Sequence, residues 1–387
     1  MADSHNTPGV ESTVYALARN SPPMRVAAIG IGGAGGRIVD ALAKDDESRN
    51  VSYLDGACVL DTDRTALGNL HAVPESARHL FGQTKIGGTG ADGDPSLAAA
   101  AFEANRIESR RAAEDAVTSE AAAIVLIASV GGGTGAGITA KLAGALQELY
   151  DRPLYAVTIL PASHEDVPDE NPARALQALD SVVDAQLVFD NNVWLDTDDD
   201  ITAVTGDLNH VLVERLSALF SAGEVAAADT VGQRVVDASE IIATLNEGGL
   251  ATIGYAEQSL QNEQQSGLGM VLDRIRGLVG SADGAVDEIT AIKAVETTLR
   301  RATRGRLTFN CPLDGATSAL LVVSGPPSWL HQSAISDGQS WLSAEIESVQ
   351  LRTGDNPLPD SGRLGVLVVF AGVRDAPRIE DLRTTDR

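Results

Sequence analysis

The sequence predicts an α/β protein in which a domain built on a parallel sheet is joined by one long helix to a smaller α+β domain. Three observations support this prediction. Between residues 24 and 200, short apolar runs rich in β-branched residues alternate with helical patterns, which is typical of a parallel sheet with helical crossovers. An apolar pattern of helical period then covers residues 201–228. Beyond it, strands and helices follow in a different order, as expected for a second domain.

Composition agrees with two domains and sets limits on the partners. A chain of 387 residues is long enough for two ordinary cores. Its formal net charge is −25 and it contains few lysines, which indicates a life in concentrated salt, where the Debye length is about 3 Å at 1 M. This acidity argues against a nucleic-acid partner. The one basic cluster is expected to be a solvated helix end paired with acids, and consists of Arg300, Arg301, Arg304 and Arg306.

The two cysteines and the hydropathy pattern bear on the compartment. Cys58 and Cys311 lie in or beside apolar runs, which favours buried thiols in a reducing compartment over a disulfide or a zinc site. The sequence shows no signal peptide and no apolar run of the ~18 residues that a membrane span needs. We therefore expect a cytoplasmic protein that does not insert directly into membranes.

The first structural unit combines a strand, a glycine run and a helix. A strand is expected at residues 24–29, the glycine run occupies 30–36, and a helix is expected at 37–43. This order contains the G-x-G-x-x-G pattern of a Rossmann dinucleotide site. The next strand, 57–60, ends at Asp61 and Asp63, where such a site would place its ribose-binding acid.

Two further glycine stretches change this interpretation. The stretch at 87–95 precedes a long helix, with Pro95 near the first helical position. The third stretch, 131–137, lies between an apolar strand at 123–130 and a helix at 138–146, and five of its seven residues are glycine. A tight turn would need one or two glycines, whereas converging N–H groups at a helix start form a phosphate cradle. Three glycine stretches fit a nucleoside triphosphate better than a dinucleotide.

The remaining elements complete the two domains. Strands are expected at 154–160 and 186–189, with a helix starting near 171 between them. In the second domain we expect strands at 251–255, 319–324 and 364–371, and helices at 289–303 and 334–346. The expected boundaries are a mobile tail at 1–23, the parallel-sheet domain at 24–200, the connecting helix at 201–234, the α+β domain at 235–374, and a loose charged tail at 375–387.

The order of these loops resembles the tubulin/FtsZ superfamily, whose signature loop is similar to residues 131–137. Within it, the chain most resembles the archaeal CetZ group, through Val188-Phe189-Asp190-Asn191 with Trp194 and through residues 236–242 and 302–307. Residues 206–210 are also similar to the start of the tubulin central helix. The resemblance implies binding of GTP and GDP with Mg²⁺, GTP hydrolysis, head-to-tail filaments of this chain or with paralogous proteins, and a cytoskeletal role in cell shape.

The resemblance also implies roles for individual residues. A primary amide offers both a donor and an acceptor to guanine, which makes asparagine a sensible base ligand. Without the resemblance, either asparagine would be read as a helix cap or turn, and Glu170 with Arg174 as a solvated i,i+4 pair. The implied nucleotide-binding residues are Gly32, Gly33, Ala34, Gly35 and Gly36 on the β-phosphate side; Gly88, Thr89, Gly90, Ala91 and Asp92 near the γ-phosphate; the signature residues Gly131, Gly132, Gly133, Thr134, Gly135, Ala136 and Gly137; Glu170 and Arg174; Asn191 and Asn209 for guanine; and Asp61 and Asp63 near Mg²⁺, through water.

Asp237 and Glu240 are the implied catalytic pair. Their spacing of three places both carboxylates on one face at a helix start. Taken alone, such a pair more often caps a helix or compensates its dipole. In the family position the pair would project into the nucleotide pocket of the next subunit and polarise the attacking water. A pocket at one end and its acids at the other form a heterologous interface, which grows into a filament.

Departures from the family pattern leave alternatives open. Gly33 stands where tubulins and most CetZ-like sequences have glutamine, so a contact toward Mg²⁺ is missing. This motivates a second hypothesis, a nucleotide-binding regulatory paralogue that does not polymerise alone. The final residues show no match to the peptide by which FtsZ recruits division partners, which favours cell shape over an FtsZ-like division role. A Rossmann oxidoreductase is a third hypothesis, motivated by residues 30–35, and the number of glycine stretches weighs against it.

Overall fold

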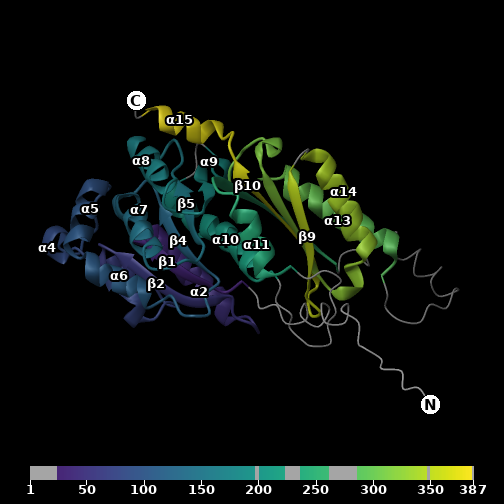
Figure 1. The fold of residues 1–387 in the computed structure, drawn as a ribbon, viewed down its shortest axis with the longest axis horizontal. Coiled ribbons are helices and arrows are strands. Elements are labelled where there is room, and N and C mark those ends of the chain that lie inside the picture. Colours follow the sequence, from purple (N-terminus) through teal and green to yellow (C-terminus); the bar gives the residue numbers. More distant parts are fainter. Residues whose placement is uncertain (1–23, 197–199, 223–235, 261–285, 347–348, 386–387) are drawn as a thin grey trace, which may run out of the picture.

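A computed structural model describes residues 24–196, 200–222, 236–260, 286–346 and 349–385. Within these ranges the strands form one ten-stranded sheet, in the order β3-β2-β1-β4-β5-β6-β7-β10-β8-β9 (Figure 1). The strands are β1 (Val26–Ile31), β2 (Leu54–Asp61), β3 (Arg78–Leu80), β4 (Ala123–Ser129), β5 (Leu154–Leu160), β6 (Ala185–Asp190), β7 (Leu250–Ser259), β8 (Ser318–Gly325), β9 (Gln350–Pro357) and β10 (Arg363–Val373). The helices are α2 (Gly32–Glu47), α3 (Arg64–Gly68), α4 (Gln83–Ile86), α5 (Pro95–Ala104), α6 (Arg106–Glu114), α7 (Gly133–Gln147), α8 (Glu170–Leu179), α9 (Asn191–Trp194), α10 (Ile201–Phe220), α11 (Ala238–Leu245), α13 (Glu288–Arg304), α14 (Gln332–Glu345) and α15 (Pro377–Thr385).

The first six strands are all parallel, as the sequence predicts. Their order, β3-β2-β1-β4-β5-β6, places β1 beside β4, and the chain runs outward in opposite directions from these two strands. In open α/β sheets this is the switch point, where ligands bind beyond the carboxyl ends of the strands. The first and third glycine stretches follow β1 and β4 directly, so the sheet order brings them to the switch point.

Alternate side chains of each strand enter different cores, because successive residues of a strand point to opposite faces. Ala28 of β1 packs in one core with α2, α10 and α11. Its neighbour Ile29 packs in another with α5 and α7. A third core joins α8, α13, α14 and α15 to the strands of the C-terminal half. The glycine edge is therefore held between helices anchored on both faces.

The two halves of the chain share the sheet. Gln186 and Leu187 of β6 pair in parallel with Leu250 and Ala251 of β7. Beyond this junction, β10 runs antiparallel to both β7 and β8, and β9 is parallel to β8 at the edge. The long helix α10 packs against α2, as well as against β7 and β10. Helix α10 covers residues 201–220 of the predicted connecting helix and ends earlier than predicted, since residues 221–222 form a turn; residues 223–235 lie outside the described ranges.

Two helices begin inside the glycine stretches, and the predicted starts at residues 37 and 138 are wrong. Helix α2 begins at Gly32 and α7 at Gly133. The reason is packing: a Cβ on Gly35 would lie 2.0 Å from the carbonyl oxygen of Ile127, and a Cβ on Gly135 would lie 2.1 Å from that of Ser129. These glycines let helix backbones rest directly on strands, which offsets the low helix propensity of glycine.

The expectation of a loose C-terminal tail is wrong for the described residues 377–385. They form α15, which lies over α8 with Ile379 and Leu382 buried (Figure 1). The segment reads as polar because only these two side chains supply apolar contacts, and ion pairs with residues far earlier in the chain complete its docking. Sequence reasoning also missed the strands β3 and β9, and it predicted one helix where Asn105 separates α5 from α6.

The basic cluster, the cysteines and the hydropathy of the helices can be compared with the expectations from composition. Arg300 pairs with Glu296 and Arg304 with Glu345, so these arginines of the basic cluster are paired with acids. Both cysteines are free thiols, Cys58 buried and Cys311 half-buried. Across the described ranges, every helix falls short of the length or the apolar character required to cross a membrane.

The packing of Gly35 predicts opposite effects for two alanine substitutions in helices. Gly35→Ala should destabilise the protein by about 3 kcal/mol or more, because the new methyl group would overlap the Ile127 carbonyl. Gly144→Ala, in α7, should stabilise it by about 0.5–1 kcal/mol, since its Cβ would meet only Val182, 4.0 Å away. Denaturant unfolding in molar salt measures both. Equal effects of the two substitutions would contradict this account of the glycine stretches.

Candidate functional site

Residues from three separate loops meet at the switch point. Gly32 has a φ of +70°, which favours glycine, and a Cβ there would lie 3.3 Å from the Cβ of Thr134. The hydroxyl of Thr134 is 2.8 Å from the hydroxyl of Thr62, which follows β2. The first glycine stretch, the loop after β2 and the third glycine stretch therefore form one continuous surface.

The second glycine stretch is joined to the same surface by backbone contacts. Asp63 and Thr89 form an isolated β-bridge, and the N–H of Gly90 donates to the carbonyl of Thr62 over 3.1 Å. A Cβ on Gly133 would lie 2.9 Å from the Cβ of Ala91, so the second and third stretches touch. The prediction that these three stretches gather at one edge is confirmed.

Asn171 is a buried residue of this surface that sequence reasoning did not single out. Its side-chain Nδ2 donates to the carbonyls of Gly93 and Gly131, each over 3.0 Å, and so ties the second stretch to the third. In sequence it reads as an ordinary polar residue at the start of a helix. Both bonds are to backbone atoms at least 40 positions away, which no local pattern reveals.

The N-termini of α2 and α7 open on this surface without side-chain caps. Neither Ile31 nor Gly132, which precede the two helices, offers a side-chain acceptor to the first helical turn, and neither first turn contains an acid. By contrast, Asp63 caps α3 and Asp94 caps α5. The first N–H groups of a helix have no partner within the helix, so two such ends side by side attract an anion. A Cβ on Gly132 would meet no atom within 4 Å, so this side of the surface is open.

Asp61 places a buried carboxyl beside these helix ends. It is 3% exposed, and its Oδ1 accepts hydrogen bonds from the N–H groups of Thr62 and Asp63, over 2.7 and 3.3 Å. Burial raises its pKa to about 6, and the charge of Asp63 adds to this, whereas the two N–H bonds and the charge of Arg37 act in the opposite direction. A buried carboxylate with incomplete compensation is suited to receive a cation.

The donor set does not form a metal site from protein groups alone. In the part of the chain that the structure describes, no three histidine, cysteine, aspartate or glutamate side chains cluster in a way that could hold a metal ion. Asp63 uses its Oδ1 to cap α3, accepting from Thr65 over 2.7 Å. Asp61 and Asp63 thus fit a cation that shares its coordination with a bound anion and water.

The other predicted binding residues lie on neighbouring elements. Asn191 begins α9 at the end of β6, is buried, and its Nδ2 donates to Glu165 Oε1 over 3.0 Å. Asn209 is half-buried on α10, which packs against α2. Glu170 and Arg174 form an exposed ion pair of 3.3 Å at the start of α8. This is the solvated i,i+4 pair that the sequence alone favours, and a role toward a ligand stays a prediction.

Asp237 and Glu240 lie apart from the glycine surface. Asp237 is the N-cap of α11, and its Oδ1 accepts from the N–H of Glu240 over 3.0 Å and from the hydroxyl of Ser239 over 2.5 Å. Helix α11 lies on the far side of α10 from α5 and α7 (Figure 1). Locally the pair is the capping arrangement that its spacing suggests.

Comparisons with known proteins bear on this architecture. Residues 25–199 match the family model "Tubulin/FtsZ family, GTPase domain", and residues 198–387 match "Tubulin-like CetZ, C-terminal domain". The chain is 39% identical to the tubulin-like protein CetZ5 of Haloferax volcanii over 363 residues, which cover 94% of this chain and 91% of that protein. This relative comes from a halophilic archaeon, in agreement with the acidic composition.

Two solved structures share the fold over nearly the whole chain. The GDP-bound monomer of CetZ1 from Haloferax volcanii superposes with a TM-score of 0.80 at 31% identity, covering 93% of this chain and 98% of that one. The GTPγS-bound protofilament of CetZ2 from the same organism gives a TM-score of 0.79 at 30% identity, covering 94% and 97%. The chain therefore belongs to the tubulin/FtsZ family and, within it, to the CetZ group.

Proposed function

We propose that the chain binds GTP and GDP, together with Mg²⁺, at the carboxyl edge of β1 and β4. The observation that carries this proposal is the meeting of two uncapped helix N-termini beside the buried carboxyl of Asp61. The first N–H groups of α2 and α7 can donate to phosphate oxygens, and the second glycine stretch encloses the γ-phosphate end. The GDP and GTPγS complexes of two similar proteins support this choice of nucleotide.

In this proposal the predicted metal ligands and base ligands have separate roles. Bound Mg²⁺ would neutralise phosphate charge, with Asp61 and Asp63 holding it directly or through water. Asn191 and Asn209 present amide donors and acceptors to the guanine edge. The Cβ position of Gly33 lies 3.4 Å from Nη1 of Arg37, so the guanidinium of Arg37 occupies the space beside this glycine.

We further propose that hydrolysis occurs between subunits of a head-to-tail filament. Asp237 and Glu240 stand at the start of α11, which packs against β8 and β10 and lies on the far side of α10 from α5 and α7 (Figure 1), so in this proposal they act on the γ-phosphate held by a neighbouring copy. There they would position and polarise the attacking water. The protofilament of a similar protein supports such self-association.

The filament would act in the cytoplasm in the control of cell shape. Two alternatives are distinguished by their outcomes. Nucleotide binding without assembly of the purified chain would favour a regulatory paralogue, and a block of division after gene loss would favour an FtsZ-like role.

Gly132→Ala should separate nucleotide binding from folding. Gly132 has φ −81° and ψ 169°, which alanine adopts freely, and its Cβ would meet no protein atom within 4 Å. We expect unchanged stability but an affinity for GDP at least about tenfold lower, because the methyl group enters the phosphate site. Titration of a fluorescent GDP analogue in molar potassium chloride with magnesium measures this. An unchanged dissociation constant for GDP would show that the phosphates do not bind at this surface.

Asp61→Asn should stabilise the nucleotide-free protein in a pH-dependent way. Because the folded pKa of Asp61, about 6, lies above its unfolded value, the folded state holds an extra proton between about pH 4 and pH 6. Stability from this group therefore falls as pH rises through that range and stays low above it. The substitution should add about 1–3 kcal/mol at pH 8 and little at pH 4, while weakening magnesium-dependent GTP binding.

Asp63→Asn is the matched control for Asp61→Asn, since asparagine caps a helix about as well as aspartate. Its stability should show no comparable gain at pH 8. Thermal unfolding of both variants and the wild type is measured at pH 4 and at pH 8, each without nucleotide and with magnesium and GTP. If Asp61→Asn were neutral without nucleotide at pH 8, the electrostatic account of Asp61 would be wrong.

Glu240→Gln and Asp237→Asn should each lower GTP turnover by at least about 100-fold while leaving GTP binding intact. Asparagine preserves the cap of α11, so Asp237→Asn removes charge without unfolding the helix start. Wild-type turnover per subunit should rise above a threshold protein concentration. Turnover that is proportional to concentration from zero and insensitive to both substitutions would contradict catalysis between subunits.

A further inference from the structure

Helix α15 is fastened to the N-terminal half of the chain at both of its ends. Near its C-terminal end, Nη2 of Arg383 contacts both carboxylate oxygens of Asp180, at 2.9 and 2.7 Å. Between the two ends, Ile379 and Leu382 are buried. Near its start, Arg378 reaches to the end of β6. The two arginines hold the same helix, but Arg378 contacts the end of β6 and Arg383 contacts Asp180, just after α8.

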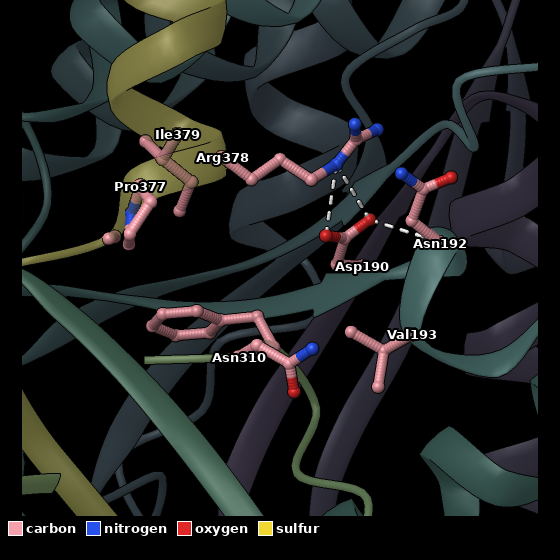
Figure 2. Close-up of a pocket in the computed structure, with 9 residues that line it drawn as sticks. Asp190, Asn192, Val193, Asn310, Pro377, Arg378 and Ile379 are labelled. Carbon is pink, nitrogen blue, oxygen red and sulfur yellow. Dashed lines mark hydrogen bonds and ion pairs between the residues drawn. The ribbon is translucent and has the colours of Figure 1, made fainter. Parts of the chain in front are cut away.

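Arg378 joins the carboxyl ends of two neighbouring strands. Its Nε lies 3.1 and 3.0 Å from the two carboxylate oxygens of Asp190, the last residue of β6, and its Nη2 donates to the carbonyl of Pro161, just after β5, over 2.7 Å (Figure 2). Asp190 is 3% exposed. Burial raises its pKa, and Arg378 opposes this shift by stabilising the charged form.

Asp190 in turn fixes the start of α9, which begins at Asn191. Its Oδ1 accepts from the N–H of Asn192 over 3.0 Å and caps the short helix (Figure 2). The loop after β5 is bound to the same place twice more. Asn191 donates to Glu165, and the Oδ1 of Asn192 accepts from the N–H of Ser163 over 2.8 Å. Arg378 is thus part of a hydrogen-bond network that includes Asn191, the proposed guanine ligand.

Among the described residues that line the neighbouring cavity, Arg378 is the one that can pair with Asp190. It borders a cavity of about 290 Å³ between α15 and the end of β6, and it is the one positively charged residue among those that line this cavity. The lining residues are Asp190, Asn192, Val193, Phe309, Asn310, Ala376, Pro377, Arg378 and Ile379. A buried carboxylate that loses its paired cation must take up a proton or move toward water. Either response disturbs the cap that orients α9.

We propose that Arg378 is a positioning residue for the base end of the nucleotide site, through which docking of α15 sets the selectivity for guanine. The inference rests on the proposed nucleotide function and adds a residue far from it in sequence. Arg378 acts through Asp190 and Asn191, whereas the start of α2 is held against the start of α7, which in turn is tied to the loop after β2 by the Thr134–Thr62 hydroxyl pair. Undocking of α15 therefore weakens recognition of the base and leaves the phosphate end as it is.

The test compares Arg378→Gln with Arg383→Gln, which breaks only the ion pair to exposed Asp180 at the other end of α15. The purified full chain is titrated, in molar potassium chloride with magnesium, with GDP, ADP and pyrophosphate. For Arg378→Gln we expect the preference for GDP over ADP to fall about tenfold, with pyrophosphate affinity unchanged. Arg383→Gln should keep the wild-type preference. The double variant Arg378→Gln with Asp190→Asn, which removes both charges, should regain most of it.

Each outcome decides the proposal. Equal loss of preference in both single variants, or equal loss of GDP and pyrophosphate affinity in Arg378→Gln, would mean that Arg378 only stabilises the fold. Lack of recovery in the double variant would exclude the pair with Asp190 as the route. A wild-type chain that binds GDP no better than ADP would overturn the proposed nucleotide function itself. A wild-type preference retained in Arg378→Gln would overturn only the role of Arg378.

Discussion

The structure depends on one constraint, the close approach of two helix N-termini at the carboxyl ends of β1 and β4. Gly35 and Gly135 permit it, because any side chain at either position would overlap a strand carbonyl. Since neither α2 nor α7 is capped by a side chain, their first N–H groups remain available at the same edge. The loops around them, tied together by Asn171 and by the threonine pair, complete a surface suited to a phosphate chain. Fold and proposed function therefore rest on the same glycines.

Much of this could be predicted from sequence, though partly for the wrong reason. The alternation of apolar runs and helical patterns predicted the parallel sheet, and the glycine stretches located its ligand edge. The number of glycines predicts phosphate contact at each of them, yet Gly35 and Gly135 are needed for helix packing, and Gly132 alone among these three opens on free space. Asn171 and α15 escaped prediction because their contacts join residues far apart in sequence, and local periodicity carries no record of such pairs.

In the proposed mechanism, the position of the acidic pair makes GTP binding a property of one chain and GTP hydrolysis a property of two. Asp237 caps α11 and Glu240 lies in its first turn, and this helix lies on the far side of α10 from α5 and α7 (Figure 1), so the proposal treats the pocket and the acids as two separate parts of one chain. Under the proposal the acids come from a second copy of the chain, and the protofilament of a similar protein supports such self-association. Hydrolysis of GTP would then depend on assembly of the filament. Within each subunit, the continuous sheet and the packing of α10 against α2 would connect the nucleotide pocket with the acidic pair.

The most direct test of this account is complementation between two inactive variants. At a GTP concentration between the two dissociation constants, Gly132→Ala should leave its weakened phosphate site mostly empty but keep its acids, whereas Glu240→Gln should bind GTP but lack an acid. Each alone should turn over GTP at a background rate. When the two are mixed in equal amounts above the assembly threshold, sites formed between a Glu240→Gln pocket and a Gly132→Ala acid face should restore turnover to a substantial fraction of wild type. A mixture no more active than its components, under conditions in which the two variants assemble together, would contradict an active site shared between subunits.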